Sequence, residues 1–378
     1  MDQDIYGKLM RHLGNVGVGY PQIDDFLEVL RKTITIEEAE IALGLPTRLP
    51  PFEVEDVDSI AEKVGKNSKK VENILERLAQ KGFLYKQKTD SGKTGYAFIQ
   101  LGFGMPQIFY WKGEITDKTK EIAPVLAKYL QKGGDVVSGT ENVRLFRYIP
   151  VNKAVNNALQ AVYSYDMMEE VIKKAKRIAV VHCPCRETAR LITESKCTHT
   201  LENCIKFNKM ADFVLEKGYG REITKEEALN IVKDTEEEGL IHFVDNCQEE
   251  VQHNCNCCSC CCWNVSPIKN RLVPRDYIMA TYYLRTTDKE LCSGCGQCAD
   301  DCPLEIIEMA GDLPIIDESI CIGCGVCLLH CPTDAAKLKR KGENVPFQNF
   351  SILHNTAIQD IIHKKSRVKI KIRCMNSD

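Results

Sequence analysis

Two stretches near the C-terminal end of the sequence decide how the chain is organised. They are Cys292–Pro303, CSGCGQCADDCP, and Cys321–Pro332, CIGCGVCLLHCP. Each cysteine of the first stretch recurs 29 positions later, which indicates a duplicated unit. The spacing in both copies is C-x2-C-x2-C-x3-C-P. A structural zinc site usually uses separated C-x2-C pairs, which would leave the third and fourth cysteines and the proline unexplained.

The repeated spacing resembles the bacterial-type ferredoxin domain, which carries two [4Fe-4S] clusters. This resemblance covers about residues 286–340. In that family the fourth cysteine of each copy crosses to the other cluster. Matched by position, the resemblance implies one cluster held by Cys292, Cys295, Cys298 and Cys331, and a second held by Cys321, Cys324, Cys327 and Cys302. It also implies one-electron transfer at low potential between neighbouring clusters.

Glycines stand between the ligands of each copy, at Gly294, Gly296, Gly323 and Gly325. We expect these residues to adopt positive φ and to turn the backbone around the clusters. The sequence between the copies, IIEMAGDLPII, predicts a hairpin that turns at Gly311 and Asp312.

The chain holds 20 cysteines, so twelve remain beyond the repeat. Residues 255–262, CNCCSCCC, contain six of them, which exceeds the four protein ligands that one cubane needs. This stretch must therefore be irregular, serve more than one metal centre, or leave some thiols free. Ten cysteines form the candidate metal set: Cys183, Cys185, Cys197, Cys204, Cys255, Cys257, Cys258, Cys260, Cys261 and Cys262.

Three interpretations of these ten cysteines stay open. The preferred one is one or more further iron–sulfur clusters, because electrons delivered by the repeat need a destination. A zinc or other structural metal site is the second, and a redox-active thiol, persulfide or metal-trafficking site is the third. The first four, from Cys183 to Cys204, could complete one site by themselves.

Several neighbours of these cysteines could take part in the same chemistry. His182, His199 and His253 lie within two residues of them and could be ligands or proton donors. Arg186 and Lys206 could offset the negative charge of thiolate-ligated clusters, although solvated surface charge is the ordinary interpretation. Cys247 could be an auxiliary ligand, and Cys374 is expected to be a bystander.

The N-terminal region has helical patterns at residues 23–31 and 57–64, and at 69–80 after a capping Ser68. Two β-prone runs follow around residues 90–92, so the region resembles a winged helix-turn-helix domain. Lys69, Lys70 and Arg77 are candidate DNA contacts. Glu72 and Glu76 on the same helix would repel phosphates, and a solvated or protein-docking face is the alternative.

We expect an α+β chain with four regions. These are a winged-helix-like domain at 1–104, a mostly helical, Cys-rich metal-binding domain at 105–285, a two-[4Fe-4S] ferredoxin domain at 286–342 and a C-terminal extension at 343–378. A net charge of −3 gives no global case for nucleic-acid or membrane binding. Phosphate-loop and dinucleotide-binding motifs are absent from the sequence.

The preferred functional hypothesis is an electron-transfer protein or oxidoreductase component of an anaerobic metabolism. It would pass electrons through the two [4Fe-4S] clusters to or from the cysteine-rich centre, with a redox protein or carrier as partner, and a larger oxidoreductase complex is possible. The competing hypothesis is a redox- or metal-responsive DNA-binding regulator, and a weaker one is a scaffold that docks on a larger enzyme. We expect a reducing cytoplasm and no membrane span, and catalytic residues are not indicated.

Overall fold

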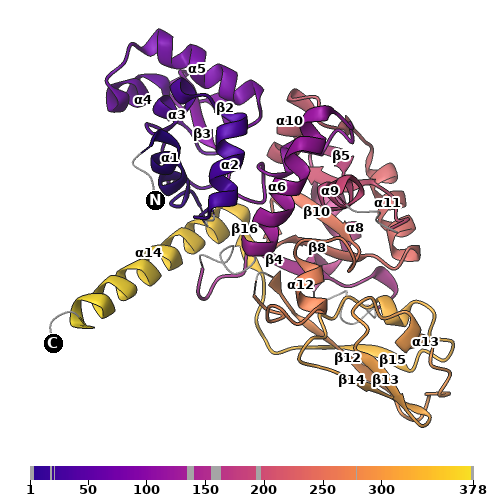
Figure 1. The fold of residues 1–378 in the computed structure, drawn as a ribbon. Coiled ribbons are helices and arrows are strands. Elements are labelled where there is room, and N and C mark those ends of the chain that lie inside the picture. Colours follow the sequence, from indigo (N-terminus) through magenta and orange to yellow (C-terminus); the bar gives the residue numbers. More distant parts are fainter. Residues whose placement is uncertain are drawn as a thin grey trace. The chain divides into compact units, whose positions relative to one another are not determined.

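The computed structural model describes residues 4–17, 19–20, 22–133, 140–154, 163–192, 197–277 and 279–375 (Figure 1). The chain divides into two compact units. The first unit comprises residues 1–143 and 354–378, and the second comprises residues 144–353. Both copies of the repeat and the ten candidate cysteines lie in the second unit. The domain boundaries expected after residues 104, 285 and 342 stay predictions, because a division into compact units does not show which segments fold independently.

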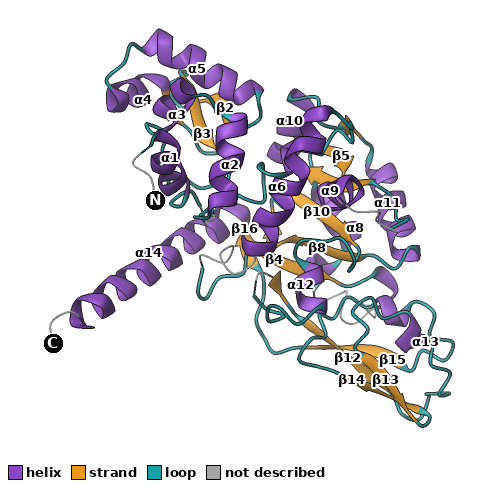
Figure 2. Cartoon of the chain, viewed as in Figure 1, coloured by secondary structure: helices purple, strands orange, loops and turns teal. Residues whose placement is uncertain are grey.

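Helices dominate the first unit (Figure 2). Its helices outside residues 55–98 are α1 (Ile5–Leu13), α2 (Asp24–Thr33), α3 (Ile36–Ala42), the short 3-10 helix η1 (Gln107–Phe109), α6 (Asp117–Gly133) and the part of α14 (Phe350–Met375) from residue 354 onward. Helix α2 packs against α6, and α1 packs against α3. The apolar faces of these helices are buried, as their helical spacing of apolar residues requires.

Residues 55–98 of this unit form a helix pair followed by a hairpin. The elements are β1 (Glu55–Asp56), α4 (Val57–Val64), α5 (Ser68–Gln80), β2 (Leu84–Lys88) and β3 (Thr94–Phe98). Strand β3 lies between β1 and β2, antiparallel to both. The helices expected at 57–64 and 69–80 and the hairpin around 90–92 are thus present. The expected cap was wrong by one residue: the Asn67 side chain accepts hydrogen bonds from the first-turn amides, because Asn is as good an N-cap as Ser.

The second unit is built around a seven-stranded sheet. In sheet order its strands are β11 (Met279–Ala280), β4 (Phe146–Ile149), β8 (Ile241–Asp245), β10 (His253–Cys257), β6 (Glu202–Phe207), β5 (Ile178–His182) and β7 (Arg221–Glu222). All neighbouring pairs are antiparallel except β11 and β4. A separate parallel pair joins β9 (Cys247–Glu249) to β16 (Phe347–Asn349).

Short helices accompany this sheet. They are η2 (Asn152–Ala154), η3 (Ser164–Asp166), α8 (Met168–Lys174), α9 (Pro184–Ile192), α10 (Asn208–Glu216), α11 (Lys225–Glu237) and α12 (Val265–Lys269). Helix α10 packs on β5 and β6, and α11 packs on α8 and β6. The Thr224 side chain caps α11 by accepting a hydrogen bond from the Glu227 amide.

The expectation of a mostly helical cysteine-rich region was wrong, because its organising element is the sheet. Strands β5 and β8 are buried along nearly their whole length. The apolar run of β5, IAVVH, is a strand signal in the sequence. Strand β8, IHFVD, places the polar His242 and Asp245 in the interior and shows neither a continuous apolar run nor an alternation.

The repeated motif folds as two similar halves. The halves are framed by β12 (Tyr283–Thr287) paired with β15 (Ala336–Arg340), and they are joined by the hairpin of β13 (Ile307–Ala310) and β14 (Leu313–Ile316). The hairpin turns at Gly311, with φ of 64°, as expected. A short helix contains the third cysteine of each copy. It is α13 (Gln297–Asp300) in the first copy and η4 (Val326–Leu328) in the second.

A buried acid joins this repeat to the sheet. The Asp166 carboxylate lies 3.4 Å from Nε of Arg147 on β4 and 2.6 Å from Nη1 of Arg340 on β15, and it accepts a hydrogen bond from the Tyr283 hydroxyl. Asp166 and Arg147 are both fully buried. A buried carboxylate with two guanidinium partners is costly to disrupt, so this network fixes the repeat against β4.

Candidate metal centre

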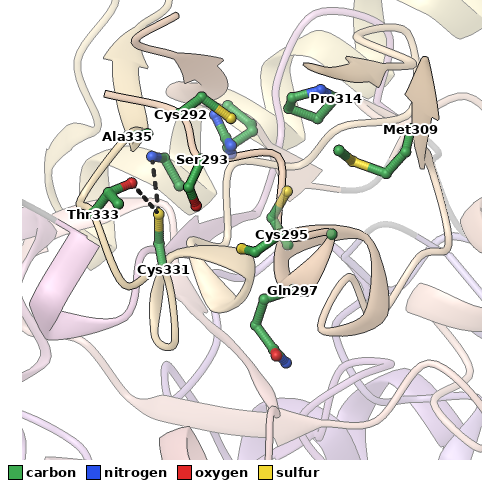
Figure 3. Close-up of a pocket in the computed structure, with 13 residues that line it drawn as sticks. Cys292, Ser293, Cys295, Gln297, Met309, Pro314, Cys331, Thr333 and Ala335 are labelled. Atoms are coloured by element: carbon green, nitrogen blue, oxygen red, sulfur yellow. Dashed lines mark hydrogen bonds between the residues drawn. The ribbon is translucent and has the colours of Figure 1, made fainter. Parts of the chain in front are cut away.

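The eight cysteines of the repeat line two hollows. One hollow is lined by Cys292, Cys295, Cys298 and Cys331 (Figure 3). The other is lined by Cys302, Cys321, Cys324 and Cys327. Each hollow thus combines three thiols of one copy with the fourth thiol of the other. These are the two ligand sets that the ferredoxin resemblance implies.

Glycine makes room for the backbone around both hollows. Gly294, Gly296, Gly323 and Gly325 all have positive φ, between 65° and 79°, as expected. A Cβ on Gly323 would lie 2.1 Å from the carbonyl oxygen of Tyr283, so that approach requires glycine. Soft thiolate donors around a hollow are the environment that an iron–sulfur cluster requires, so the residues present fit such a group.

The two hollows differ in their exposure to solvent. In the first, Cys295 is exposed and its three partners are half-buried, whereas all four cysteines of the second are buried. Burial raises the pKa of Cys324 well above its usual range and that of Cys327 to about 12. Only a bound cation would keep such buried thiols ionised, because a thiolate is otherwise costly to bury. The first hollow is the more accessible one for a redox partner.

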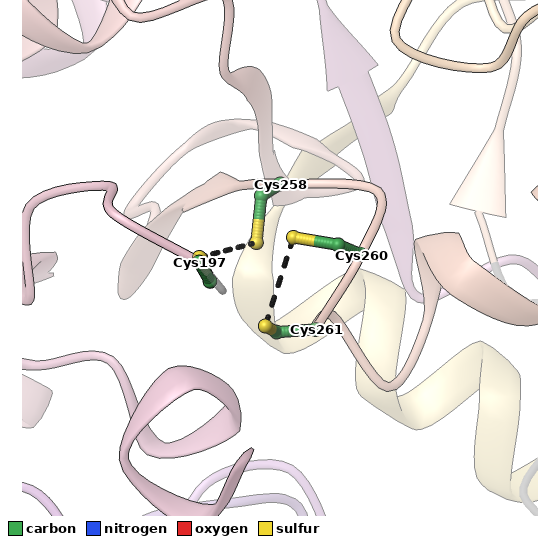
Figure 4. A group of neighbouring side chains, drawn as sticks. All are labelled: Cys197, Cys258, Cys260 and Cys261. Atoms are coloured by element: carbon green, nitrogen blue, oxygen red, sulfur yellow. Dashed lines mark hydrogen bonds between the residues drawn. The ribbon is translucent and has the colours of Figure 1, made fainter. Parts of the chain in front are cut away.

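Four other cysteines converge on one point at the edge of the unit. The thiols of Cys197, Cys258, Cys260 and Cys261 all lie within 4.8 Å of one another (Figure 4). The Sγ atoms are 3.9 Å apart for Cys197 and Cys258, and 3.7 Å apart for Cys260 and Cys261. We call this group the four-thiol set. The last three members come from the turn after β10, and Cys197 comes from a segment 61 positions earlier in the chain.

The spacing within the four-thiol set fits a single tetrahedral ion. Thiolate sulfurs at about 2.3 Å from one ion lie about 3.8 Å from one another in a regular tetrahedron. The Sγ–Sγ distances of the two pairs agree with that value, and all the other pairs lie within 4.8 Å. A cubane binds each thiolate to a different iron, and its ligand sulfurs are therefore farther apart. Cys260 is exposed and Cys258 is buried, so an ion held here would lie at the surface.

Hydrogen bonding and burial act in opposite directions on these thiols. The hydrogen bond from Cys261 lowers the pKa of Cys258 to about 5, although burial opposes the shift. Burial, together with the neighbouring Cys258, raises the pKa of Cys260 to about 12. The set therefore contains one thiol that ionises readily, and metal binding must displace a proton from another.

The remaining six candidate cysteines form a second group, which we call the six-thiol set: Cys183, Cys185, Cys204, Cys255, Cys257 and Cys262. The Sγ atoms of Cys204 and Cys255 lie 3.9 Å apart. Electrostatic interactions connect Cys185 with Cys183 and Cys262, and Cys257 with Cys262 and Cys255.

Strand geometry explains how the cysteine-rich stretch serves both groups. Successive side chains of a strand point to opposite faces, so Cys255 and Cys257 share one face of β10 and the intervening Asn256 points to the other. Strand β6 is antiparallel to β10, with Asn254 opposite Ile205, and this register brings Cys204 beside Cys255. The chain then turns after Cys257.

Two buried cations lie beside the six-thiol set. The Lys206 ammonium, on the same strand as Cys204, lies 3.3 Å from the Cys204 sulfur, and Lys206 is 3% exposed. Arg186, on α9, is 1% exposed and donates through Nη2 to the Asn203 side chain and to the Asn256 carbonyl. Both residues are charge-offsetting candidates in the sequence, and the structure places them in the interior, where a cation needs a compensating anion.

The other candidates of the sequence lie outside both groups. The imidazoles of His182, His199 and His253 each lie within 3.2 Å of a carboxylate oxygen, of Glu187, Glu238 and Asp245 respectively. Cys247 is fully buried on β9, and the Arg147 guanidinium donates to its carbonyl oxygen. The side chain of Cys374 lies outside the described residues. Tyr148, a buried residue of β4, has no sequence signal that would mark it as a neighbour of these cysteines.

Two of the three candidate DNA contacts, Lys70 and Arg77, lie beside an acidic side chain. The Lys70 ammonium lies 3.1 Å from one oxygen of Glu37, and the Arg77 guanidinium lies 3.2 Å from the other. Lys69 follows Asn67 on the exposed first turn of α5. Ion pairing within the unit reduces the positive potential that the sequence suggests for this helix.

Among the described residues, no helix combines the length and the apolar composition that a membrane crossing needs. None of the nineteen cysteines with described side chains forms a disulfide. Comparison with curated proteins and with solved structures gave no match. Comparison with family models gave a match over residues 291–336, which identifies this part of the chain as a ferredoxin-type 4Fe-4S dicluster domain.

Proposed function

We propose that this protein transfers electrons through two [4Fe-4S] clusters to or from a metal ion held by the four-thiol set. The observation that carries this proposal is the convergence of Cys197, Cys258, Cys260 and Cys261 in the same compact unit as the dicluster domain. A redox partner protein or carrier follows from the dicluster domain, and membership of a larger oxidoreductase complex is a further part of the proposal.

The two hollows support the ligand assignment of the clusters. In it, Cys292, Cys295, Cys298 and Cys331 hold one cluster, and Cys321, Cys324, Cys327 and Cys302 hold the other. When bound, the clusters supply one-electron redox chemistry. The chain supplies the thiolate ligands, the glycine turns that admit the clusters, and the difference in burial that leaves the first hollow open to a partner.

The metal proposed for the four-thiol set is iron. A tetrahedral set of four thiolates suits either zinc or iron, but zinc has no redox chemistry and could not exchange electrons with the clusters. Low-potential clusters and this many free thiols suit a reducing cytoplasm and an anaerobic metabolism, which we include in the proposal.

We also infer that residues 55–98 are a winged helix-turn-helix module, because β1, α4, α5 and the β2–β3 hairpin follow one another in that order. The ion pairs of Lys70 and Arg77 with Glu37 favour a docking role over DNA contact. In the competing regulator hypothesis the module would bind promoter DNA at low salt, and changing Lys69 and Lys70 to Ala would abolish that binding. Absence of low-salt binding in the unchanged protein would reject the regulator hypothesis.

Metal analysis of anaerobically purified protein tests the proposed centre. We expect Cys258→Ser and Cys260→Ser to lower the iron content by about one ion per chain, because each change removes one of four ligands. The dicluster signals in electron paramagnetic resonance (EPR) should stay unchanged. The matched control is Cys247→Ser, which removes a buried thiol outside both groups and should keep the full iron content. Unchanged iron in the first two variants, or zinc in place of this iron, would contradict the proposal.

A further inference from the structure

The six-thiol set is too large and too extended for the single ion that suits the four-thiol set. Its thiols interact with one another in a string from Cys183 through Cys185, Cys262, Cys257 and Cys255 to Cys204, and the Sγ atoms of the last pair lie 3.9 Å apart. Among the described residues, only the four-thiol set is compact enough for all its ligand atoms to surround one ion. A string of six thiols suits several metal ions that share ligands or bridging sulfide.

Burial distinguishes this set from the surface group. Cys183, Cys204, Cys257 and Cys262 are each between 2% and 7% exposed. Two of these thiols lie on neighbouring strands of the seven-stranded sheet, Cys204 on β6 and Cys257 on β10. Ligands on strands are positioned more precisely than ligands on loops, which suits a preformed metal site.

Arg186 provides the second, independent observation. Its Nε and Nη1 atoms are buried and have no hydrogen-bond partner among the described residues. Within the described part of the chain, its Nη2 atom donates to two neutral groups, the Asn203 side-chain amide and the Asn256 carbonyl. Buried N–H donors are rarely left unpaired, and a buried guanidinium needs negative charge nearby. Thiolates and sulfide of a metal cluster would supply both the acceptors and the charge.

Arg186 directly follows Cys185 in the chain, at one end of the set. At the other end the Lys206 ammonium lies 3.3 Å from the Cys204 sulfur. The two cations thus accompany the thiols along the string.

We propose that the six-thiol set holds a buried iron–sulfur centre with more than one iron, separate from the ion of the four-thiol set. This inference rests on the proposed electron-transfer function and adds a second centre to it. In this arrangement Cys258, Cys260 and Cys261 serve the surface ion, while Cys255, Cys257 and Cys262 serve the buried centre. The cysteine-rich stretch of residues 255–262 is then divided three and three.

Tyr148 places this centre next to the dicluster domain. Tyr148 lies on β4, is 2% exposed, and its hydroxyl has no hydrogen-bond partner among the described residues. Tyr148 lies opposite Phe243 of β8, and Phe243 lies opposite Cys255 of β10. The amide of Val151, just after β4, donates to the Cys324 carbonyl at 2.9 Å. The buried hollow therefore contacts the end of β4, and the six-thiol set begins two strands away in the same sheet.

Metal and acid-labile sulfide analysis of the anaerobically purified full chain tests the proposal. Two cubanes and one tetrahedral ion account for about nine irons per chain. We expect more than this number, with sulfide above the eight of the two cubanes. About nine irons with eight sulfides would overturn the buried centre and keep the proposed function, whereas eight irons would contradict both.

Substitution locates the extra iron. Cys257→Ser and Cys262→Ser should lose at least two irons and the corresponding Mössbauer component, while the dicluster EPR signals persist and report that the unit is folded. Cys247→Ser, a buried matched control, should lose none, and Cys260→Ser should lose only the surface ion. If Cys257→Ser lowers iron no more than Cys247→Ser does, the proposal is wrong. Should the cysteine variants fail to fold, the stoichiometry of the unchanged chain decides alone.

Discussion

The equivalent glycines Gly296 and Gly325 of the two copies offer a matched test of how the buried hollow is positioned. Both have φ of 79°, but a Cβ on Gly325 would lie 2.5 Å from the Ala154 Cβ and 3.2 Å from a Val151 methyl group. At Gly296 a Cβ would meet no described atom within 4 Å. The two Gly→Ala changes therefore impose the same backbone conformation on alanine and differ in packing.

The expected magnitudes follow from these contacts. Placing alanine in the left-handed region costs about 1–2 kcal/mol in either variant. Gly325→Ala must also displace Ala154, and overpacking of this kind typically costs a further 1–3 kcal/mol. We therefore expect Gly325→Ala to lose about 1–3 kcal/mol more free energy of unfolding than Gly296→Ala.

Anaerobic guanidinium titration, followed by the visible absorption of the clusters and by far-UV circular dichroism, measures this difference. Gly325→Ala should also disturb the EPR signal of the buried cluster more than Gly296→Ala disturbs that of the exposed one. Equal losses of stability in the two variants would refute the packing of the second copy against residues 151–154.

Three further predictions follow from the second unit. Asp166→Asn should lower the free energy of unfolding by about 3–5 kcal/mol, because buried Arg147 and half-buried Arg340 lose their carboxylate. Asp212→Asn, which breaks an exposed pair, should cost less than about 1 kcal/mol. Similar guanidinium midpoints for the two variants would refute the role of this network. A hydrophilic chelator should remove metal in two phases, with the ion at exposed Cys260 lost first, and stopped-flow absorption that shows a single phase would contradict the division into surface and buried sites. Lys206→Met should make the reduction potential of the buried centre more negative in an EPR redox titration, since a cation stabilises the reduced form. The control Lys209→Met, on the exposed face of α10, should leave this potential unchanged. Identical potentials in the two variants would show that Lys206 does not face the centre.

The dicluster domain could be predicted from the sequence because its ligands are local. In each ligand set three cysteines lie within seven consecutive residues, and the fourth comes from the other copy of the repeat. The glycine conformations follow for the same reason. The hairpin at Gly311 was equally predictable, since short-range turn chemistry determines it.

The division of the other ten cysteines could not be predicted. It depends on the register of β10 against β6, which sets Cys204 beside Cys255, and on the approach of Cys197 to Cys258 from 61 positions away. Composition identified the ten cysteines as candidate metal ligands, but adjacent residues such as Cys257 and Cys258 belong to different groups only because the strand ends between them. Of the sheet, the apolar run of β5 is a strand signal in the sequence, whereas the central strands β8, β10 and β6 contain buried polar residues and carry no such pattern.

Iron and acid-labile sulfide content per chain, measured on anaerobically purified protein together with Mössbauer spectra, tests the central claim most directly. The account predicts more than the roughly eight irons of two cubanes, with spectral components for a tetrahedral thiolate-bound iron and for a further cluster. About eight irons per chain, with only the two [4Fe-4S] components in the spectra, would contradict it.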